Sequence, residues 1–497
     1  MKPFPDVTPN TWAFLRDPMI KPTGFREYDA RWKYPEEINL PGITALGLGL
    51  GTQMYRRGID PVIAVGNDYR DYSLAIKNAL ILGLMQAGIE VRDIGPALSP
   101  MAYFAQFHLD VPAVAMVTAS HNPNGWTGVK MGFDRPLTHG PDEMAELRDI
   151  VLSGTGEPRP GGGYQFVEGV KDAYLDDLVG DFKMTRKLRV VCATGNGTAS
   201  AFAPDLFERL GVEVIASHNE LDYTFPAYNP NPEAMEMLHD MADTVKATGA
   251  DFALGFDGDG DRCGVVDNEG EEIFADKMGV ILARDLSKLY PGATFVADVK
   301  STGLFAADPE LRRLGAKADY WKTGHSHMKR RVKELGALAG FEKSGHYFLA
   351  EPVGKGYDCG MRVAVEVCKL MDRNPELSMA DLRRALPVTY STPPMSPSSA
   401  DTEKYDDLAR LVERLVAKHS AGETLAGRKI ADVVTVNGAR VILDNGSWGL
   451  VRASSNTPNL VVVCESAESE DEMRKIFAEI DAVIRTEPSV GEYDQTV

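Results

Sequence analysis

The chain has 497 residues, of which 44% are hydrophobic and 25% charged, close to folded globular averages, and this length predicts roughly three to four domains. Its formal net charge of −19 repels nucleic acid and anionic lipid, so we expect neither nucleic acid nor a membrane as partner. The five cysteines are scattered, which argues against a disulfide framework. No run of about 18 apolar residues occurs, which argues against a membrane span, and we expect a cytoplasmic protein.

A unit of strand, helix and second strand recurs three times along the chain. In each copy a short apolar strand leads to an amphipathic helix that ends at a glycine, which suits the left-handed position after a helix. This order of elements predicts right-handed crossovers in mainly parallel sheets. The strands cover 62–65, 190–193 and 295–299, and the glycines are Gly88, Gly211 and Gly315.

Two segments rich in Pro, Gly and Ser, 154–163 and 391–400, are typical of linkers or hinges. After the second, strands around 439–443, 449–453 and 460–463 precede a helix that Ser469 and Glu472 begin as a capping box. We therefore predict an α/β fold of three related α/β domains with mainly parallel mixed sheets plus a C-terminal α+β domain. The predicted domains span 1–155, 164–275, 276–388 and 400–497.

The segment GFDGDGDRCGVVD places Asp257, Asp259 and Asp261 in alternation with glycines after an apolar strand. Three carboxylates in five residues repel one another unless a hard divalent cation binds them, and the glycines let the backbone curl around one centre. An EF-hand would have Gly and Glu where Arg262 and Asn268 stand. A phosphatase with an Asp-x-Asp nucleophile is a further alternative.

The segment VTASHNPNGWTGVK places Ser120 and His121 in a turn-rich loop after the apolar run 111–117, with Lys130 ten residues after Ser120. A serine at a strand end beside polar groups is a candidate nucleophile or phosphate carrier. Serines in turns are also commonly structural, so this segment taken alone leaves both interpretations open.

Two later segments carry polar groups suited to a sugar phosphate. GFEKSGHYF contains Glu342, Ser344 and His346 around Gly345. In LVRASSNTPNL a guanidinium that can grip a phosphate with two hydrogen bonds precedes a cluster of hydroxyl and amide side chains. These residues are Arg452, Ser454, Ser455, Asn456 and Thr457.

Taken together, the four segments resemble the α-D-phosphohexomutases, most closely the bacterial phosphomannomutase/phosphoglucomutase type, over nearly the whole chain. TASHNP is similar to the phosphoserine loop of that family, DGDGDR to its metal loop, EKSGH to its sugar loop and RASSNTP to its phosphate loop. The resemblance implies four domains around a central cleft. It also implies a phosphorylated Ser120 and Mg²⁺ held by a phosphoserine oxygen with Asp257, Asp259 and Asp261.

The implied reaction is the reversible interconversion of a hexose 6-phosphate and a hexose 1-phosphate, of mannose, glucose or both. A hexose 1,6-bisphosphate is the implied intermediate and activator. By resemblance, Ser120, Lys130, His325, Arg31 and Arg262 are catalytic. The implied substrate-binding residues are Tyr28, Lys300, Gly324, Glu342, Ser344, His346, Arg452, Ser454, Ser455, Asn456 and Thr457.

Several points stay open at the level of sequence. A phosphoglucosamine mutase is the alternative within the family, although Gln is usual there at the position of Lys343. His325, Arg31 and Lys130 are all candidates for the general base. The family's usual Gly-Arg-Asp-x-Arg segment appears here as 66–70, GNDYR. A calcium-binding module without activity is disfavoured by the incomplete EF-hand pattern, and we expect a monomer.

Overall fold

The computed structural model of the protein describes residues 11–454 and 457–495. The chain forms two compact units, of which the first contains Met1–Phe274 and Ser344–Ala380 and the second Ala275–Lys343 and Asp381–Val497. Within the described residues, no helix combines the length and the apolar character needed to cross a membrane.

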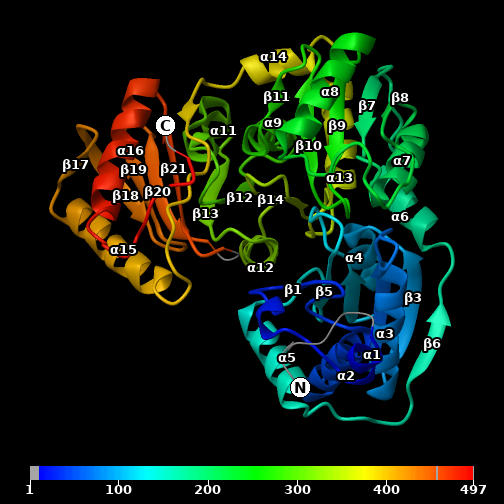
Figure 1. The fold of residues 1–497 in the computed structure, drawn as a ribbon. Helices are drawn as coiled ribbons and strands as arrows, with labels where there is room; N and C mark the ends of the chain where they lie inside the picture. Colours follow the sequence, from blue (N-terminus) through cyan, green and yellow to red (C-terminus); the bar gives the residue numbers. More distant parts are fainter. Residues whose placement is uncertain (1–10, 455–456, 496–497) are drawn as a thin grey trace. The chain divides into compact units, whose positions relative to one another are not determined.

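The first unit begins with a mixed six-stranded sheet in the order β1-β5-β4-β2-β3-β6 (Figure 1). Its strands β4, β2, β3 and β6 run parallel, whereas at one edge β5 pairs antiparallel with β4 and β1 pairs antiparallel with β5. The strands are β1 (Ala30–Lys33), β2 (Val62–Asn67), β3 (Glu90–Pro96), β4 (Ala113–Val117), β5 (Trp126–Gly132) and β6 (Gly163–Phe166).

Helices α2, α3 and α5 pack beside one another against this sheet (Figure 1). The α2 and α3 backbones approach so closely that a side chain at Gly47 or Gly83 would collide with the other helix. A Cβ on Gly47 would lie 2.2 Å from the Leu80 carbonyl oxygen, and one on Gly83 would lie 1.9 Å from the Thr44 carbonyl oxygen. The helices of this part are α1 (Trp12–Arg16), η1 (Pro22–Gly24), α2 (Leu40–Arg56), α3 (Ser73–Gln86), α4 (Ser99–His108) and α5 (Pro141–Ser153).

A second sheet of the first unit has the order β11-β10-β9-β7-β8. Helix α8 packs its methionines on β7, β9 and β10. Helices α6, α7 and α13 also belong to the part of the first unit that contains this second sheet. The strands are β7 (Arg189–Ala193), β8 (Glu213–Ser217), β9 (Phe252–Phe256), β10 (Cys263–Asp267) and β11 (Glu272–Ile273). The helices are α6 (Val170–Val179), η2 (Thr198–Ala201), α7 (Ala203–Leu210), α8 (Met235–Thr248) and α13 (Gly360–Arg373), and β15 (Tyr347–Leu349) precedes α13.

In the second unit β13, β12 and β14 pair in parallel. Helix α12 packs on β12 and β14. The elements are α9 (Ala275–Leu289), β12 (Thr294–Asp298), α10 (Leu304–Ala307), α11 (Pro309–Arg313), β13 (Lys317–Trp321), α12 (His325–Leu335) and β14 (Ala339–Phe341), and α14 (Met379–Arg384) comes later in the chain.

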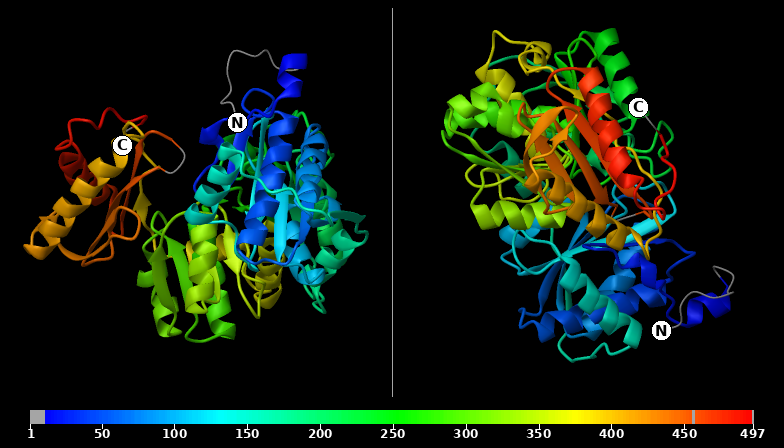
Figure 2. Two further views of the ribbon diagram at one scale, coloured as in Figure 1. Left: turned by 90° about the horizontal axis from the view of Figure 1, so that it is seen from below. Right: turned by 90° about the vertical axis from the view of Figure 1, so that its left-hand side faces the viewer.

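The chain ends in an antiparallel six-stranded sheet of order β16-β21-β20-β19-β18-β17. Helices α15 and α16 cover one of its faces (Figures 1 and 2). The elements are α15 (Lys404–Ser420), α16 (Glu470–Ile484), β16 (Tyr390–Ser391), β17 (Thr424–Leu425), β18 (Arg428–Val434), β19 (Ala439–Leu443), β20 (Trp448–Ala453) and β21 (Leu460–Ser466).

The predicted fold class is confirmed, since three parts contain parallel strands with helices and the last is antiparallel. Gly88, Gly211 and Gly315 have φ of 79°, 78° and 73°, the left-handed conformation expected after a helix. The predicted linker 391–400 lies instead along the C-terminal sheet, with its Met395 amide donating to the Val462 carbonyl (3.0 Å).

The predicted capping box at α16 forms only in part. The Ser469 hydroxyl accepts a hydrogen bond from the Glu472 amide at 3.2 Å, as expected. The Glu472 carboxylate, however, accepts from the Ser447 (2.8 Å) and Ser466 hydroxyls instead of returning to Ser469. The tertiary contact with the turn before β20 and the end of β21 thus replaces the local one.

The face of the C-terminal sheet opposite α15 and α16 packs, through Trp448 and Leu450, on Val299, which follows β12, and on Tyr320 of β13. Glu465 on β21 lies in this contact and is 3% exposed. Its carboxylate accepts hydrogen bonds from the Gly303 amide at 2.7 Å and from Lys277 at 3.2 Å. Burial would raise the pKa of Glu465, but Lys277 and these donors lower the pKa to about 2.

This pKa predicts a pH dependence of stability. Because the folded pKa of Glu465 lies below the unfolded value, the stabilisation is present at neutral pH and is lost as the pH falls toward the folded pKa of about 2. Glu465→Gln should therefore destabilise the protein most at neutral pH, and its deficit in unfolding free energy should shrink by about 2 kcal/mol by pH ~3. Denaturant unfolding followed by tryptophan fluorescence at several pH values measures this gap, and a constant gap would contradict the expectation.

Candidate active site

Three carboxylates converge in the loop that joins β9 to β10. Asp257, Asp259 and Asp261 are each 0% exposed, and one oxygen from each lies within 4.8 Å of the others. The positive φ of Gly260 (72°) produces the curl predicted from the glycine pattern. The loop therefore gathers three buried acids around one point.

Lys130 on β5 supplies a buried positive charge to this cluster. Its ammonium donates to Asp259 Oδ2 at 2.7 Å and to Asp261 Oδ2 at 2.5 Å. Burial would lower the pKa of Lys130, but Asp259 and Asp261 raise it well above the ordinary value, so the lysine stays protonated. Burial and the repulsion of its two acidic neighbours raise the pKa of Asp257 well above the usual range. Lys130 thus hydrogen-bonds to two of the three carboxylates, Asp259 and Asp261.

The donor set fits a hard divalent cation. All three side chains offer carboxylate oxygens, the ligands preferred by Mg²⁺ and Ca²⁺. Asp259 Oδ1 is buried and accepts no hydrogen bond from any residue in the described ranges, which leaves a polar atom of the kind a metal would satisfy. Asp259 Oδ2 is fixed from the other side by Ser99 Oγ at 2.5 Å. The acidic cluster can therefore hold a metal ion.

Ser120 lies directly against this cluster, in the loop between β4 and β5. Its hydroxyl donates to Asp257 Oδ2 at 3.1 Å and lies 3.3 Å from His121 Nδ1. Ser120 has φ of 54°, a conformation that L residues rarely adopt, and its amide donates to Thr118 Oγ1 at 2.9 Å. Burial and the nearby Arg262 and Arg31 lower the pKa of His121 well below its ordinary value, so this imidazole is neutral.

Arg70 holds the Ser120 loop in this conformation, a role that sequence reasoning did not assign. Its buried guanidinium donates to the carbonyl oxygens of Ser120 (2.8 Å) and Asn122 (2.6 Å) and pairs with Asp68. Asp68 in turn accepts from the Ser73 hydroxyl at 2.5 Å. The sequence feature that could have identified Arg70 is the segment 66–70, GNDYR, which differs from the family's usual Gly-Arg-Asp-x-Arg but keeps its final arginine.

Loss of this anchor should impair catalysis without touching the reacting groups. Arg70→Met frees the strained Ser120 loop, and a misplacement of about 1 Å can cost about 10²-fold in rate. We expect turnover to fall on that scale while the metal requirement stays unchanged. Arg135→Met is the matched control, because Arg135 pairs with an exposed Asp110 on the surface. Equal, small losses in both variants would contradict the assigned role.

The predicted sugar loop reaches the acid cluster through His346. The imidazole Nε2 lies 3.4 Å from Asp261 Oδ1, and Nδ1 lies 3.0 Å from the Ser344 hydroxyl. Arg262 donates through Nη1 to Glu233 Oε2 at 2.6 Å, and its Nε lies 3.8 Å from Asp257 Oδ2. The first unit thus brings His346, Ser344 and Arg262 together with the metal cluster.

Arg31 on β1 belongs to the same region. Its Nη2 pairs with Asp29 Oδ2 at 2.9 Å, and its strand neighbour in β5 is Gly128, two residues from Lys130. Burial would lower the pKa of Arg31, but the charges of Asp29 and Asp259 raise it. The predicted Tyr28 is partly exposed beside this pair.

Further predicted residues gather within the second unit, where β12 ends. Asp298 accepts hydrogen bonds from Ser301 Oγ (2.5 Å) and Thr323 Oγ1 (2.9 Å), and the Lys300 ammonium lies 3.8 Å from its Oδ2. The buried Glu342 accepts from the Gly324 amide at 2.6 Å. The predicted His325 follows Gly324 as the first residue of α12 and is 5% exposed.

The predicted phosphate loop follows β20. Arg452 is 7% exposed, and its Nη1 donates to the Ala453 carbonyl at 2.8 Å. Ser454 Oγ lies 2.7 Å from Thr457 Oγ1, and the Lys404 ammonium donates to the Ser454 carbonyl at 2.7 Å. The predicted Ser455 and Asn456 lie outside the described residues.

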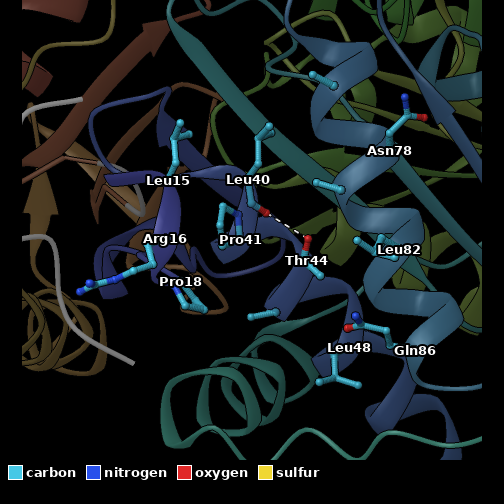
Figure 3. Close-up of a pocket in the computed structure, with 13 residues that line it drawn as sticks. Leu15, Arg16, Pro18, Leu40, Pro41, Thr44, Leu48, Asn78, Leu82 and Gln86 are labelled. Atoms are coloured by element: carbon cyan, nitrogen blue, oxygen red, sulfur yellow. Dashed lines mark hydrogen bonds between the residues drawn. The ribbon is translucent and has the colours of Figure 1, made fainter. Parts of the chain in front are cut away.

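A separate pocket on the first unit is apolar and lies among α1, α2 and α3 (Figure 3). The Thr44 hydroxyl there donates to the Leu40 carbonyl (3.1 Å) within its own helix. Arg16 is the sole charged residue among those that line it, and none of the predicted site residues does so. The pocket is therefore not the candidate active site.

Models of one protein family match four successive parts of the chain. They are described as phosphoglucomutase/phosphomannomutase, alpha/beta/alpha domain I (22–157), domain II (172–270) and domain III (274–390), and the C-terminal domain (402–483). The chain belongs to the phosphoglucomutase/phosphomannomutase family. It is therefore a phosphohexomutase, as the segments around Ser120 and Asp257 suggested.

Individual relatives of this phosphohexomutase agree. A phosphomannomutase/phosphoglucomutase of Pseudomonas putida is 35% identical over 91% of this chain and 93% of its own length. One from Pseudomonas syringae is 34% identical over 92% and 94%. A family protein of Burkholderia thailandensis, solved by crystallography, superposes with a TM-score of 0.85 and 29% identity over 96% of this chain and 100% of that one.

Proposed function

We propose that the protein interconverts hexose 1-phosphates and hexose 6-phosphates of mannose, glucose or both, with Ser120 as the phosphate carrier. One observation supports this above all: the Ser120 hydroxyl lies 3.1 Å from Asp257, one of three buried carboxylates suited to a divalent cation. A serine that merely closes a turn needs neither a metal cluster nor a strained φ of 54°.

The metal is proposed to be Mg²⁺, held by Asp257, Asp259 and Asp261 together with an oxygen of the phosphate on Ser120. Bound there, the ion would neutralise charge on the oxygens of the transferring phosphoryl group. Lys130 and Arg262 supply further positive charge beside it, and both stay protonated because burial is outweighed by neighbouring carboxylates that raise the pKa of each.

Each transfer forms one bond and breaks another. The free hydroxyl of the bound hexose monophosphate attacks phosphorus as the bond between phosphorus and Ser120 Oγ breaks, which gives hexose 1,6-bisphosphate. The hydroxyl proton passes to a base and a proton returns to Ser120 Oγ. After the bisphosphate has turned, its other phosphoryl group moves back to Ser120 by the reverse exchange, and the product is released.

His325 is the proposed general base. Lys130 and Arg31 were the other candidates, but their raised pKa values keep both in the protonated form, which cannot accept a proton. Those two residues are better suited to bind negative charge. Arg31 is held for that role by Asp29, at 2.9 Å.

The non-reacting phosphate is proposed to bind Arg452 with the phosphate loop, and the sugar to bind Glu342 and Ser344. These groups supply the local cationic and polar site that an anionic substrate needs on a chain of net charge −19. Proposed substrate contacts are Tyr28, Lys300, Gly324, His346, Ser454, Ser455, Asn456 and Thr457. The domain boundaries given above and a monomeric, cytoplasmic protein also remain proposals.

Turnover of purified protein with mannose, glucose and glucosamine 1-phosphates, with Mg²⁺ and a trace of hexose 1,6-bisphosphate, tests the proposal. We expect both mannose and glucose phosphates to be converted, because Glu342 and Ser344 leave the 2-hydroxyl uncontacted in this proposal. A clear preference for glucosamine phosphate would favour the glucosamine branch of the family. Release of inorganic phosphate without isomerisation would favour an aspartate phosphatase.

A further inference from the structure

A positively charged side chain is buried between two parts of the second unit without an acidic partner. Arg440 on β19 is 1% exposed, and its guanidinium lies 3.7 Å from the ring centroid of Trp448 and 4.0 Å from that of Tyr320. No carboxylate of the described residues lies within 4.0 Å of it. Burying an unpaired charge is costly, so packing alone is a poor explanation for an arginine here.

The Arg440 guanidinium instead hydrogen-bonds to the backbone on both sides of Lys300. Arg440 Nη1 donates to the carbonyl oxygens of Val299 and Ser301, each at 2.7 Å. These two carbonyls belong to the residues immediately before and after Lys300. Arg440 therefore fixes the peptide segment from which this proposed substrate-binding lysine projects.

Glu465 forms hydrogen bonds with the next two residues of this segment, Thr302 and Gly303. Its Oε1 accepts from Thr302 Oγ1 (2.9 Å) and the Gly303 amide (2.7 Å), and also from Trp448 Nε1 (3.0 Å), the ring that stacks on Arg440. Arg440 and Glu465 of the C-terminal sheet thus hydrogen-bond to four residues of the loop after β12, Val299, Ser301, Thr302 and Gly303. Both ends of the contact use charged groups with directional hydrogen bonds, which specify a position more sharply than apolar packing does.

The same sheet carries the proposed phosphate-binding arginine. Arg440 pairs with Leu450 across β19 and β20, and Arg452 lies two residues further along β20. Because side chains alternate along a strand, Arg452 lies on the same face as Trp448 and Leu450, which pack on Val299. Arg440, which pairs with Leu450, therefore lies on the same face of the C-terminal sheet as Arg452.

We infer that Arg440, with Glu465, is a positioning residue for substrate binding: it holds the backbone on both sides of Lys300, so that this cation meets the sugar phosphate in a preset position. This inference rests on the proposed function, because it assumes that Lys300 binds substrate. Preorganisation lowers the cost of ordering this side chain on binding. The effect should accordingly appear in KM and Kd, whereas kcat should change little.

A double-mutant cycle tests this dependence. Arg440→Met is expected to raise the KM for glucose 1-phosphate about tenfold in the otherwise wild-type enzyme but only about twofold in Lys300→Met, because neighbouring residues that act together are not additive. The same cycle in the Ser120→Ala protein, with the Kd of glucose 1-phosphate measured by calorimetry, gives a readout without turnover. An equal increase in both backgrounds would overturn the inference.

Two further variants and one control keep the result interpretable. If Arg440→Met fails to fold, Arg440→Lys and Glu465→Gln replace it in the cycle. Each substitution keeps the size of the side chain but weakens its hydrogen bonds to 299–303. Arg331→Met is the matched control: Arg331 stacks on Trp321 at 4.0 Å in the same unit but pairs with Asp319, away from Lys300. A similar KM increase in Arg331→Met would also contradict the inference. Wild-type turnover, measured first, tests the proposed function independently.

Discussion

Ser120→Ala is expected to lower mutase turnover by about 10³-fold or more, because it removes the only atom to which the phosphoryl group is bound between the two half-reactions. The substitution removes one oxygen at a site where the Ser120 hydroxyl contacts Asp257 and His121. Binding of hexose phosphate should be retained, since the proposed binding groups lie elsewhere. Coupled-enzyme turnover and calorimetric binding measure the two quantities separately.

Ser200→Ala is the control for this result. Ser200 is buried in the same unit and its hydroxyl lies 2.7 Å from Thr194 Oγ1, but it contacts none of the three acids. We expect near-normal turnover in that variant. Substantial turnover in Ser120→Ala would exclude a carrier role for this serine and would favour the aspartate nucleophile instead.

Removal of divalent metal is the second change with a large expected effect. Without a cation, Asp257, Asp259 and Asp261 repel one another in a buried site whose nearest lysine and arginine are Lys130, hydrogen-bonded to two of them, and Arg262, 3.8 Å from Asp257. We expect chelation to reduce turnover by about 10³-fold or more and added Mg²⁺ to restore it, because charge neutralisation is the main contribution in phosphoryl transfer. Turnover measured against the concentration of free Mg²⁺ follows the effect.

Asp261→Asn should raise the Mg²⁺ concentration needed for half-maximal turnover, as it removes one ligand charge. Asp267→Asn provides the comparison, because Asp267 is an equally buried acid on β10 whose carboxylate accepts from the Glu269 and Glu271 amides. Its substitution should affect stability while the Mg²⁺ requirement stays the same. Full activity in the thoroughly metal-free enzyme would contradict the assignment of the acid cluster.

Local sequence patterns predicted much of the fold. The strands expected at 439–443, 449–453 and 460–463 correspond to β19, β20 and β21, because alternation along a strand and turn residues between strands are local properties. The convergence of Asp257, Asp259 and Asp261 was predictable for the same reason, since all three lie in one short loop.

Contacts between distant segments were not predictable in this way. Arg70 reaches the Ser120 carbonyl across 50 positions, and Ser99 reaches Asp259 across 160. The 391–400 segment has the composition of a linker, yet pairs with β21, because a sheet edge accepts any backbone with free amides and carbonyls. Such partners are set by the tertiary fold, and composition carries no signal for them.

Phosphate mapping after incubation with hexose 1,6-bisphosphate tests the central claim most directly. The account predicts an acid-stable phosphate ester on the peptide that contains Ser120, which disappears when excess hexose monophosphate is added. Phosphate attached to Asp257 as an acyl phosphate that hydroxylamine removes, or no phosphate on any peptide, would contradict it.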